Sequence, residues 1–156
     1  GMEHRVGGLE KWEETGHVSY DPENHQKMVE LRQQKVDVIA NDIALAKSFG
    51  KGNGDLLVIG WGGTHGALRS AVETAQEKGM SVSHLHLRHL NPLPRNLGEI
   101  LVKFQKVMIA ELNMGQLAAI IRSKFLVDAV SLNKVQGKPF TITEVFKKIT
   151  ELVKGA

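Results

Sequence analysis

The sequence predicts an α/β fold in which helices cover both faces of a mainly parallel sheet, making three layers, α/β/α. Two continuous apolar runs support this prediction, Leu-Leu-Val-Ile at 56–59 and Val-Met-Ile-Ala at 107–110. Such runs are typical of central strands that are buried on both faces. From residue 54 on, short apolar runs alternate with stretches of helical periodicity, which indicates a layered α/β domain whose crossovers are right-handed.

Turn residues separate the expected elements of this region. Gly79 stops a helix, the Asn-Pro-Leu-Pro sequence at 91–94 makes a rigid turn, and Gly-Lys-Pro at 137–139 makes another. In chain order the sequence predicts a strand over 55–61, a helix over 64–78, a strand over 81–90, a helix over 95–104, a strand over 106–112, a helix over 115–125, a strand over 129–135 and a helix over 141–154.

The first third of the chain reads differently from the rest. Residues 1–21 have no apolar period and predict an extended arm or linker with too few apolar anchors to be held firmly. Asp-Pro-Glu at 21–23 is a helix start, and near-helical apolar spacing predicts one long linking helix over 22–50, with an end near Phe49. Glycines at 50, 52 and 54 end that helix, which leaves 51–156 as the α/β domain. Gly1 before Met2 resembles the remnant of a cleaved tag, so we expect a piece of a longer chain.

Composition excludes several classes of function. The chain has no cysteine, which excludes disulfides and Cys-ligated zinc or iron–sulfur clusters. Its basic residues are scattered and its aromatic residues few, so we expect no nucleic-acid partner. No run of ~18 apolar residues and no signal-peptide core are present, so we expect no membrane contact and the cytoplasm as the default location. Residues 1–50 hold 6 Lys/Arg and 9 Asp/Glu, whereas 51–156 hold 14 and 8; this asymmetry fits docking between the two parts or a basic surface facing an anionic partner.

A glycine-rich turn follows the first central strand. Gly62, Gly63, Thr64 and His65 lie at the carboxyl end of that strand and open a helix, where open α/β sheets bind ligands and free N–H groups attract anions. The dinucleotide fingerprint would need glycine at position 65, so that motif does not fit. The alternatives are a tight turn with Thr64 as N-cap and a weak anion or cofactor contact.

Two histidines alternate with leucines along the strand over 81–90. His84 and His86 share one strand face, opposite Leu85 and Leu87, and this spacing can chelate a metal. No third ligand is evident nearby, so we assign no metal site. A polar strand face or an interface lining are the alternatives.

Polar residues also follow the two later strands. Glu111 lies near the carboxyl end of the sheet, where a carboxylate can serve acid–base chemistry, but no partner is placed beside it. Asn113 is a plausible N-cap, and Gln116 follows it; cap and interface roles are the other reading. Three further polar residues, Asn133, Lys134 and Gln136, lie in a segment that is either a binding loop or an ordinary strand–turn–helix link. Like the residues of the glycine turn and of the segment after Glu111, they are candidates for loops that bind an anion or another ligand or form an interface.

Several motifs occur in the order found in one known family. They are Gly8-Leu9-Glu10, Thr15-Gly16-His17, Ser19-Tyr20-Asp21-Pro22-Glu23-Asn24-His25, Gly60-Trp61-Gly62, His84-Leu85-His86-Leu87-Arg88, Asn91-Pro92-Leu93-Pro94, Glu111-Leu112-Asn113-Met114-Gly115-Gln116-Leu117 and Asn133-Lys134-Val135-Gln136-Gly137-Lys138-Pro139-Phe140. With them the chain resembles the C-terminal part of the alpha subunit of 2-oxoglutarate:ferredoxin oxidoreductase, in the 2-oxoacid:acceptor oxidoreductase family.

The resemblance implies a transketolase C-terminal-like domain of about five strands, one of them antiparallel, preceded by a linker. It implies a parent enzyme that decarboxylates a 2-oxoacid on thiamine diphosphate and Mg²⁺, passes electrons through an iron–sulfur cluster to ferredoxin, and forms acyl-CoA from CoA. The implied partners are the rest of the alpha subunit, a beta subunit and ferredoxin, in an oligomeric enzyme.

No position of this chain matches a catalytic residue of that family. We therefore expect a structural and assembly domain that binds no cofactor, holds no catalytic residue and is inactive in isolation. The alternatives are a CoA- or nucleotide-binding α/β module and a small independent α/β enzyme that uses the glycine turn and Glu111.

Overall fold

The computed structural model describes residues 7–155 of the chain. The chain divides into two compact units, residues 1–43 and 44–156. Of the arm predicted over 1–21, residues 1–6 lie outside the described part. Among the described residues, no helix is both long and apolar enough to cross a membrane.

The first unit contains a small hairpin and one long helix. Strands β1 (Glu10–Lys11) and β2 (Val18–Ser19) pair in antiparallel fashion. Helix α1 (Pro22–Asp37) begins as the sequence predicts, because the Asp21 carboxylate accepts a hydrogen bond of 2.9 Å from the Asn24 amide and Pro22 takes the first helical turn.

The predicted end of this helix is wrong. Helix α1 stops at Asp37, a 3₁₀ turn η1 (Val38–Asn41) follows, and Ser48–Phe49 forms the short strand β3. Val38 and Ile39 are exposed, so the apolar spacing that suggested one continuous helix is not the buried stripe of a packed helix. Pairing of β3 with another strand takes Phe49 out of the helical pattern altogether.

Within residues 7–21 of the predicted arm, a polar contact attaches the hairpin to α1. The Glu10 carboxylate accepts two hydrogen bonds from the Arg32 guanidinium, at 3.1 and 2.7 Å, and lies 3.1 Å from His25 Nδ1. Arg32 foremost, and then the Lys11 amide, hold the pKa of Glu10 at about 2. This bidentate ion pair joins the hairpin to α1.

The second unit contains a five-stranded sheet in the order β3-β5-β4-β6-β7. Strands β5, β4, β6 and β7 run parallel, and β3 pairs with β5 in antiparallel fashion. The strands of this sheet after β3 are β4 (Gly54–Trp61), β5 (Val82–Leu87), β6 (Phe104–Glu111) and β7 (Ala129–Asn133). The predicted mostly parallel sheet with one antiparallel strand is confirmed.

The helices of this unit are close to the predicted ones, except that one is shorter. They are η2 (Gly62–Thr64), α2 (His65–Glu77), α3 (Leu97–Leu101), α4 (Gln116–Phe125) and α5 (Ile142–Lys154). Helix α3 is shorter than the predicted 95–104, because Phe104 already begins β6. Helix α5 starts with the capping box of Thr141 and Glu144, in which each side chain accepts a hydrogen bond from the other's backbone N–H.

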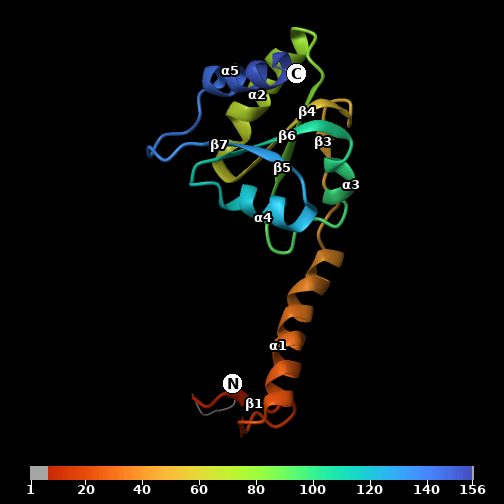
Figure 1. Cartoon of the computed structure of the whole chain (residues 1–156), viewed down its shortest axis with the longest axis vertical. Coiled ribbons are helices and arrows are strands. Elements are labelled where there is room, and N and C mark those ends of the chain that lie inside the picture. Colours follow the sequence, from red (N-terminus) through yellow and green to blue (C-terminus); the bar gives the residue numbers. More distant parts are fainter. Residues whose placement is uncertain (1–6, 156) are drawn as a thin grey trace. The chain divides into compact units, whose positions relative to one another are not determined.

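The core fills both spaces between the sheet and its helices, so the α/β/α layering is confirmed (Figure 1). On one face α2 and α5 pack on the sheet with a buried cluster made of Leu56, Val58, Leu68, Ala71, Val72, Ala75, Val82, Met108, Ala110, Phe140, Val145 and Ile149. On the other face α3 and α4 pack on Leu57, Ile59, Leu85, Leu87, Val107 and Ile109 among others. The alternation along β5 places both leucines on the α3/α4 face, as predicted.

Candidate functional site

The carboxyl edge of the sheet gathers the polar loops that the sequence singled out. Strands β4, β6 and β7 are neighbours and parallel, so their ends at Trp61, Glu111 and Asn133 lie along one edge. The loops over 62–65, 111–116 and 133–136 therefore start side by side, although they are far apart in the sequence. Open α/β sheets bind ligands at this edge.

Glu111 is the centre of this edge, and both its carboxylate oxygens are occupied. The side chain is fully buried. Oε1 accepts a hydrogen bond of 3.0 Å from the Ala118 amide, and Oε2 accepts one of 2.9 Å from the Leu117 amide. Oε2 also accepts hydrogen bonds from Trp61 Nε1 at 3.3 Å and Asn113 Nδ2 at 3.1 Å. Glu111 thus caps the free N–H groups of α4 from the end of β6, and it joins β4 to β6.

Asn113 has a smaller capping role than we predicted. Its Oδ1 accepts hydrogen bonds from the Gly115 amide at 2.8 Å and the Gln116 amide at 3.4 Å. The residue at the N-cap position is Gly115, in the left-handed region with φ of 97°. Asn113 therefore shapes the turn, while Glu111 caps the helix. Gln116 is exposed.

In the glycine turn, the Thr64 hydroxyl does not accept a hydrogen bond from the start of α2. Gly62 adopts φ of 58°, which favours glycine, and the turn continues as η2. The Thr64 hydroxyl donates a hydrogen bond of 2.9 Å to the Trp61 carbonyl, so it does not accept one from the helix. Thr64 takes the N-cap position of α2, as predicted, but its side chain makes no capping hydrogen bond, because the hydroxyl is used by the turn that precedes the helix. Gly63 and His65 are exposed.

The segment after β7 is tied to the domain by Lys134. The Lys134 amide donates a hydrogen bond of 3.0 Å to the Glu111 carbonyl. Its ammonium group donates to the Pro139 carbonyl at 3.0 Å and to both Glu144 oxygens at 2.8 Å. Asn133 lies against Gly115, and Gln136 is exposed. These contacts of the Lys134 ammonium group hold it at the start of α5, in an internal ion pair with Glu144.

The Glu144 ion pair predicts a pH dependence of stability. Lys134 first, and then the Thr141 amide and hydroxyl, lower the pKa of Glu144 from 4.5 to about 2. Because the pKa is depressed in the folded chain, these contacts stabilise it fully above pH 4.5 and are lost as the pH falls toward 2. We expect the thermal unfolding midpoint of Glu144→Gln, followed by circular dichroism, to fall less than that of the wild-type chain over this range. Parallel curves for the two proteins would contradict the assignment.

The strand histidines gain a neighbour that the sequence did not indicate. The rings of His84 and His86 on β5 lie near the ring of His65 at the start of α2, with centroid separations of 4.9 to 5.9 Å. Within the described residues, no three His, Cys, Asp or Glu side chains are placed to hold a metal ion. The approach of His65 follows from the packing of α2 on the sheet, and no local spacing could have signalled it.

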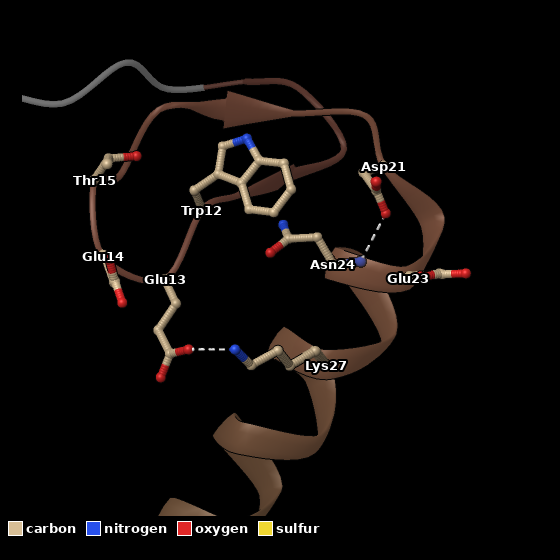
Figure 2. A pocket seen from close by; sticks show the side chains of 8 residues that line it. All are labelled: Trp12, Glu13, Glu14, Thr15, Asp21, Glu23, Asn24 and Lys27. Atoms are coloured by element: carbon tan, nitrogen blue, oxygen red, sulfur yellow. Dashed lines mark hydrogen bonds and ion pairs between the residues drawn. The ribbon is translucent and has the colours of Figure 1, made fainter.

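A hollow lies in the first unit. It has a volume of about 600 Å³ and is formed by the hairpin loop and the first turns of α1 (Figure 2). Glu13, Glu14, Asp21 and Glu23 line it, and Lys27 pairs with Glu13 at 2.7 Å. Its one buried polar side chain, Asn24, already donates a hydrogen bond to the Lys11 carbonyl.

Two solved structures resemble this chain, one in fold alone and one in both fold and sequence. A split-gene transketolase resembles 69% of this chain with a TM-score of 0.55 and 15% identity, a likeness of fold alone that agrees with the transketolase-like topology. The 2-oxoglutarate:ferredoxin oxidoreductase of Magnetococcus marinus, solved with 2-oxoglutarate, coenzyme A and succinyl-CoA bound, matches 97% of this chain and 27% of its own, with a TM-score of 0.86 and 27% identity.

Sequence comparison defines the family. The model of pyruvate:ferredoxin oxidoreductase core domain II matches residues 54–145, and the chain belongs to this family. Among curated relatives, the 2-oxoglutarate oxidoreductase subunit KorA of Mycobacterium tuberculosis is 45% identical over 99% of this chain. Subunit alpha of 2-oxoacid:ferredoxin oxidoreductase 1 of Aeropyrum pernix is 30% identical over 92% of it. The chain spans 24% of the length of either relative.

Proposed function

We propose that this chain serves as a structural and assembly domain in the alpha subunit of a 2-oxoacid:ferredoxin oxidoreductase, with 2-oxoglutarate as the 2-oxoacid. The names of its relatives and the match to the Magnetococcus marinus enzyme support this role. The parent enzyme forms acyl-CoA, CO₂ and reduced ferredoxin in the cytoplasm, with the beta subunit and the rest of the alpha subunit as partners.

The observation that carries the proposal is the contrast between polar and apolar groups at the carboxyl edge. Glu111 and Lys134 are engaged with other parts of the domain, so they are poorly placed to act on a substrate. Beside them Leu112, Met114 and Val135 are exposed, and Met114 is 77% exposed. An edge whose chemical groups are internally paired and whose apolar side chains face outward fits a protein partner better than a small substrate.

The iron–sulfur cluster and the Mg²⁺ ion of the parent enzyme do not fit the residues of this chain. An iron–sulfur cluster needs cysteine thiolates, and the sequence has none. Mg²⁺ of a thiamine diphosphate site needs carboxylate or other oxygen ligands, and the buried carboxylate at the edge has both oxygens occupied by N–H donors. We therefore assign Mg²⁺ and the cluster to other parts of the complex.

Replacing one exposed apolar side chain at this edge tests the role. In the complete alpha subunit, Met114→Asp would place a charge in the proposed contact and remove an apolar side chain worth roughly 1.5–3 kcal/mol when buried. We expect its association with the beta subunit, measured by analytical ultracentrifugation, to weaken by about 10- to 100-fold.

The matched control is Leu126→Asp at the opposite end of α4, where the leucine is 90% exposed. We expect this variant to associate as the wild type does. Circular dichroism of both variants checks that they fold. Wild-type association of a folded Met114→Asp subunit would remove the proposed assembly contact from this edge.

A further inference from the structure

A cavity of about 480 Å³ lies beside the three-histidine cluster, within the unit of residues 44–156. It is formed by the end of β5, the start of α2 and the segment that leads into β3. Its lining includes His65, His84 and His86, together with Lys47 and Arg88. Its volume falls within the range of ~300–1,000 Å³ that is common for small-molecule sites.

Two ring nitrogens in this cavity lack a partner. His84 is 3% exposed, and its Nε2 has no hydrogen-bond partner among the described residues. His86 Nδ1 is likewise buried without a partner among them. A buried polar atom that stays unpaired costs free energy, so a ligand that pairs with these atoms binds more favourably than one that does not.

The charges that line the cavity select the sign of the ligand. Lys47, Arg69 and Arg88 line it, and no Asp or Glu does. Neither Lys47 nor Arg88 forms an ion pair with another described residue. Arg69 is held over the Phe49 ring at 3.1 Å and also pairs with Glu73. A cation would be repelled here, whereas an anion would meet several positive groups and N–H donors.

His84 is neutral near pH 7 while the cavity holds no anion. Burial, and then the neighbouring charges of His86, His65 and Arg69, lower the pKa of His84 to about 3. Burial and the charges of His65 and Arg88 also lower the pKa of His86, although a backbone hydrogen bond to Gly62 opposes this. A bound anion would offset the repulsion among these groups, so it would favour imidazolium forms that donate from both nitrogens.

The side of the cavity that carries Lys47 is fixed by hydrogen bonds of the residues on either side of it. The Ala46 amide donates to Asn96 Oδ1 at 2.9 Å, and Asn96 Nδ2 donates back to the Ala46 carbonyl at 2.9 Å. Directly after Lys47, Ser48 and Phe49 pair with Leu85 and His84 in the sheet. The cationic wall and the histidine wall are thus parts of one hydrogen-bonded framework, and a ligand would meet a preformed site.

We propose that this cavity binds a phosphate group, free or as part of a small phosphorylated molecule. A phosphate dianion offers three terminal oxygens, which suits several cationic and N–H donors that converge from different elements. Leu45, Leu87 and Pro94 also line the cavity, and they provide an apolar side where an organic part can lie. His65 belongs both to this cavity and to the glycine turn over 62–65, where a weak anion contact stays a separate prediction. This inference does not depend on the assembly role.

Titration of the full chain with inorganic phosphate tests the proposal. We expect phosphate to shift the ring-nitrogen NMR signals of His84 and His86, and calorimetry in buffers of different ionisation enthalpy to show proton uptake. Arg88→Ala removes an exposed charge, so it should fold normally and weaken phosphate binding by about 10-fold or more. The matched control is Lys147→Ala on the exposed side of α5, which should bind phosphate as the wild type does.

Two further titrations identify the source and the class of the anion. ADP that binds more tightly than inorganic phosphate assigns the site to a phosphorylated molecule, and the reverse order assigns it to free phosphate; either result supports the proposal. Succinate that binds as tightly as phosphate would overturn the phosphate assignment. Unchanged histidine signals in 50 mM phosphate, a concentration about 50-fold above a millimolar Kd, or wild-type affinity of Arg88→Ala, would overturn the site itself.

Discussion

Glu111→Ala is expected to destabilise the chain by about 3–5 kcal/mol, because it removes the acceptor of several buried donors at once. The amides of Leu117 and Ala118 and the indole N–H of Trp61 would all lose their partner. Urea unfolding followed by circular dichroism measures the free energy of unfolding. Hydrogen exchange should show that the Leu117 and Ala118 amides lose protection most.

Glu111→Gln separates the loss of acceptors from the loss of volume. The amide keeps the shape of the side chain, but its NH₂ group must face N–H donors in place of one oxygen. We expect a loss of about 2–3 kcal/mol. The control Glu77→Gln changes an exposed glutamate at the end of α2 and should stay within about 0.5 kcal/mol of the wild type. A Glu111→Gln chain as stable as this control would show that the four contacts contribute little.

Gly60→Ala is expected to destabilise the chain by about 1–3 kcal/mol through overpacking. Gly60 lies near the end of β4, and a Cβ there would collide with the Leu68 side chain and the Thr64 hydroxyl. Both neighbours belong to the start of α2 and its preceding turn, so the missing Cβ lets the helix pack closely against the strand. The measurement is again the free energy of unfolding in urea.

The matched control for this change is Gly66→Ala, only a few residues further along the chain. Gly66 lies in the first turn of α2, and a Cβ there would meet nothing within 4 Å. Alanine is the better helix former, so we expect this variant to gain about 0.5–1 kcal/mol. Equal effects of the two substitutions would mean that glycine at position 60 is not required by packing.

The sheet was predictable from the sequence because its signals are local. The apolar runs at 56–59 and 107–110 and the alternation along β5 each depend on which residues a strand buries, so strand order along the chain and the two-sided core followed from them. The start of α1 was also predictable, since Asp21 and Pro22 act within one turn. The end of α1 was not predictable from the sequence, because it depends on a distant contact. Phe49 belongs to β3, which pairs with β5, and β5 follows only after β4 and α2 along the chain.

The sequence predicted where the polar residues of the site lie, but not which contacts their side chains make. The sequence put Glu111 at the carboxyl edge, yet its partners come from α4 and from Trp61 on a neighbouring strand, which only the folded chain brings together. The Glu10–Arg32 pair joins residues far apart in the sequence for the same reason. Lys134 looked available for a ligand, and its engagement by Glu144 depends on how α5 returns to the sheet.

Strand β3 has a consequence for how the sheet is protected from other molecules. It covers part of one side of β5 with only Ser48 and Phe49, and it also contributes Phe49 beside Arg69. A shortened chain that began at Lys51, the start we predicted for the α/β domain, would lose this strand. The N–H and C=O groups of β5 would then face solvent along an unpaired edge, which is a template for strands of other copies. We therefore expect a chain that begins at Lys51 to self-associate more than one that begins at Ala44 and keeps β3.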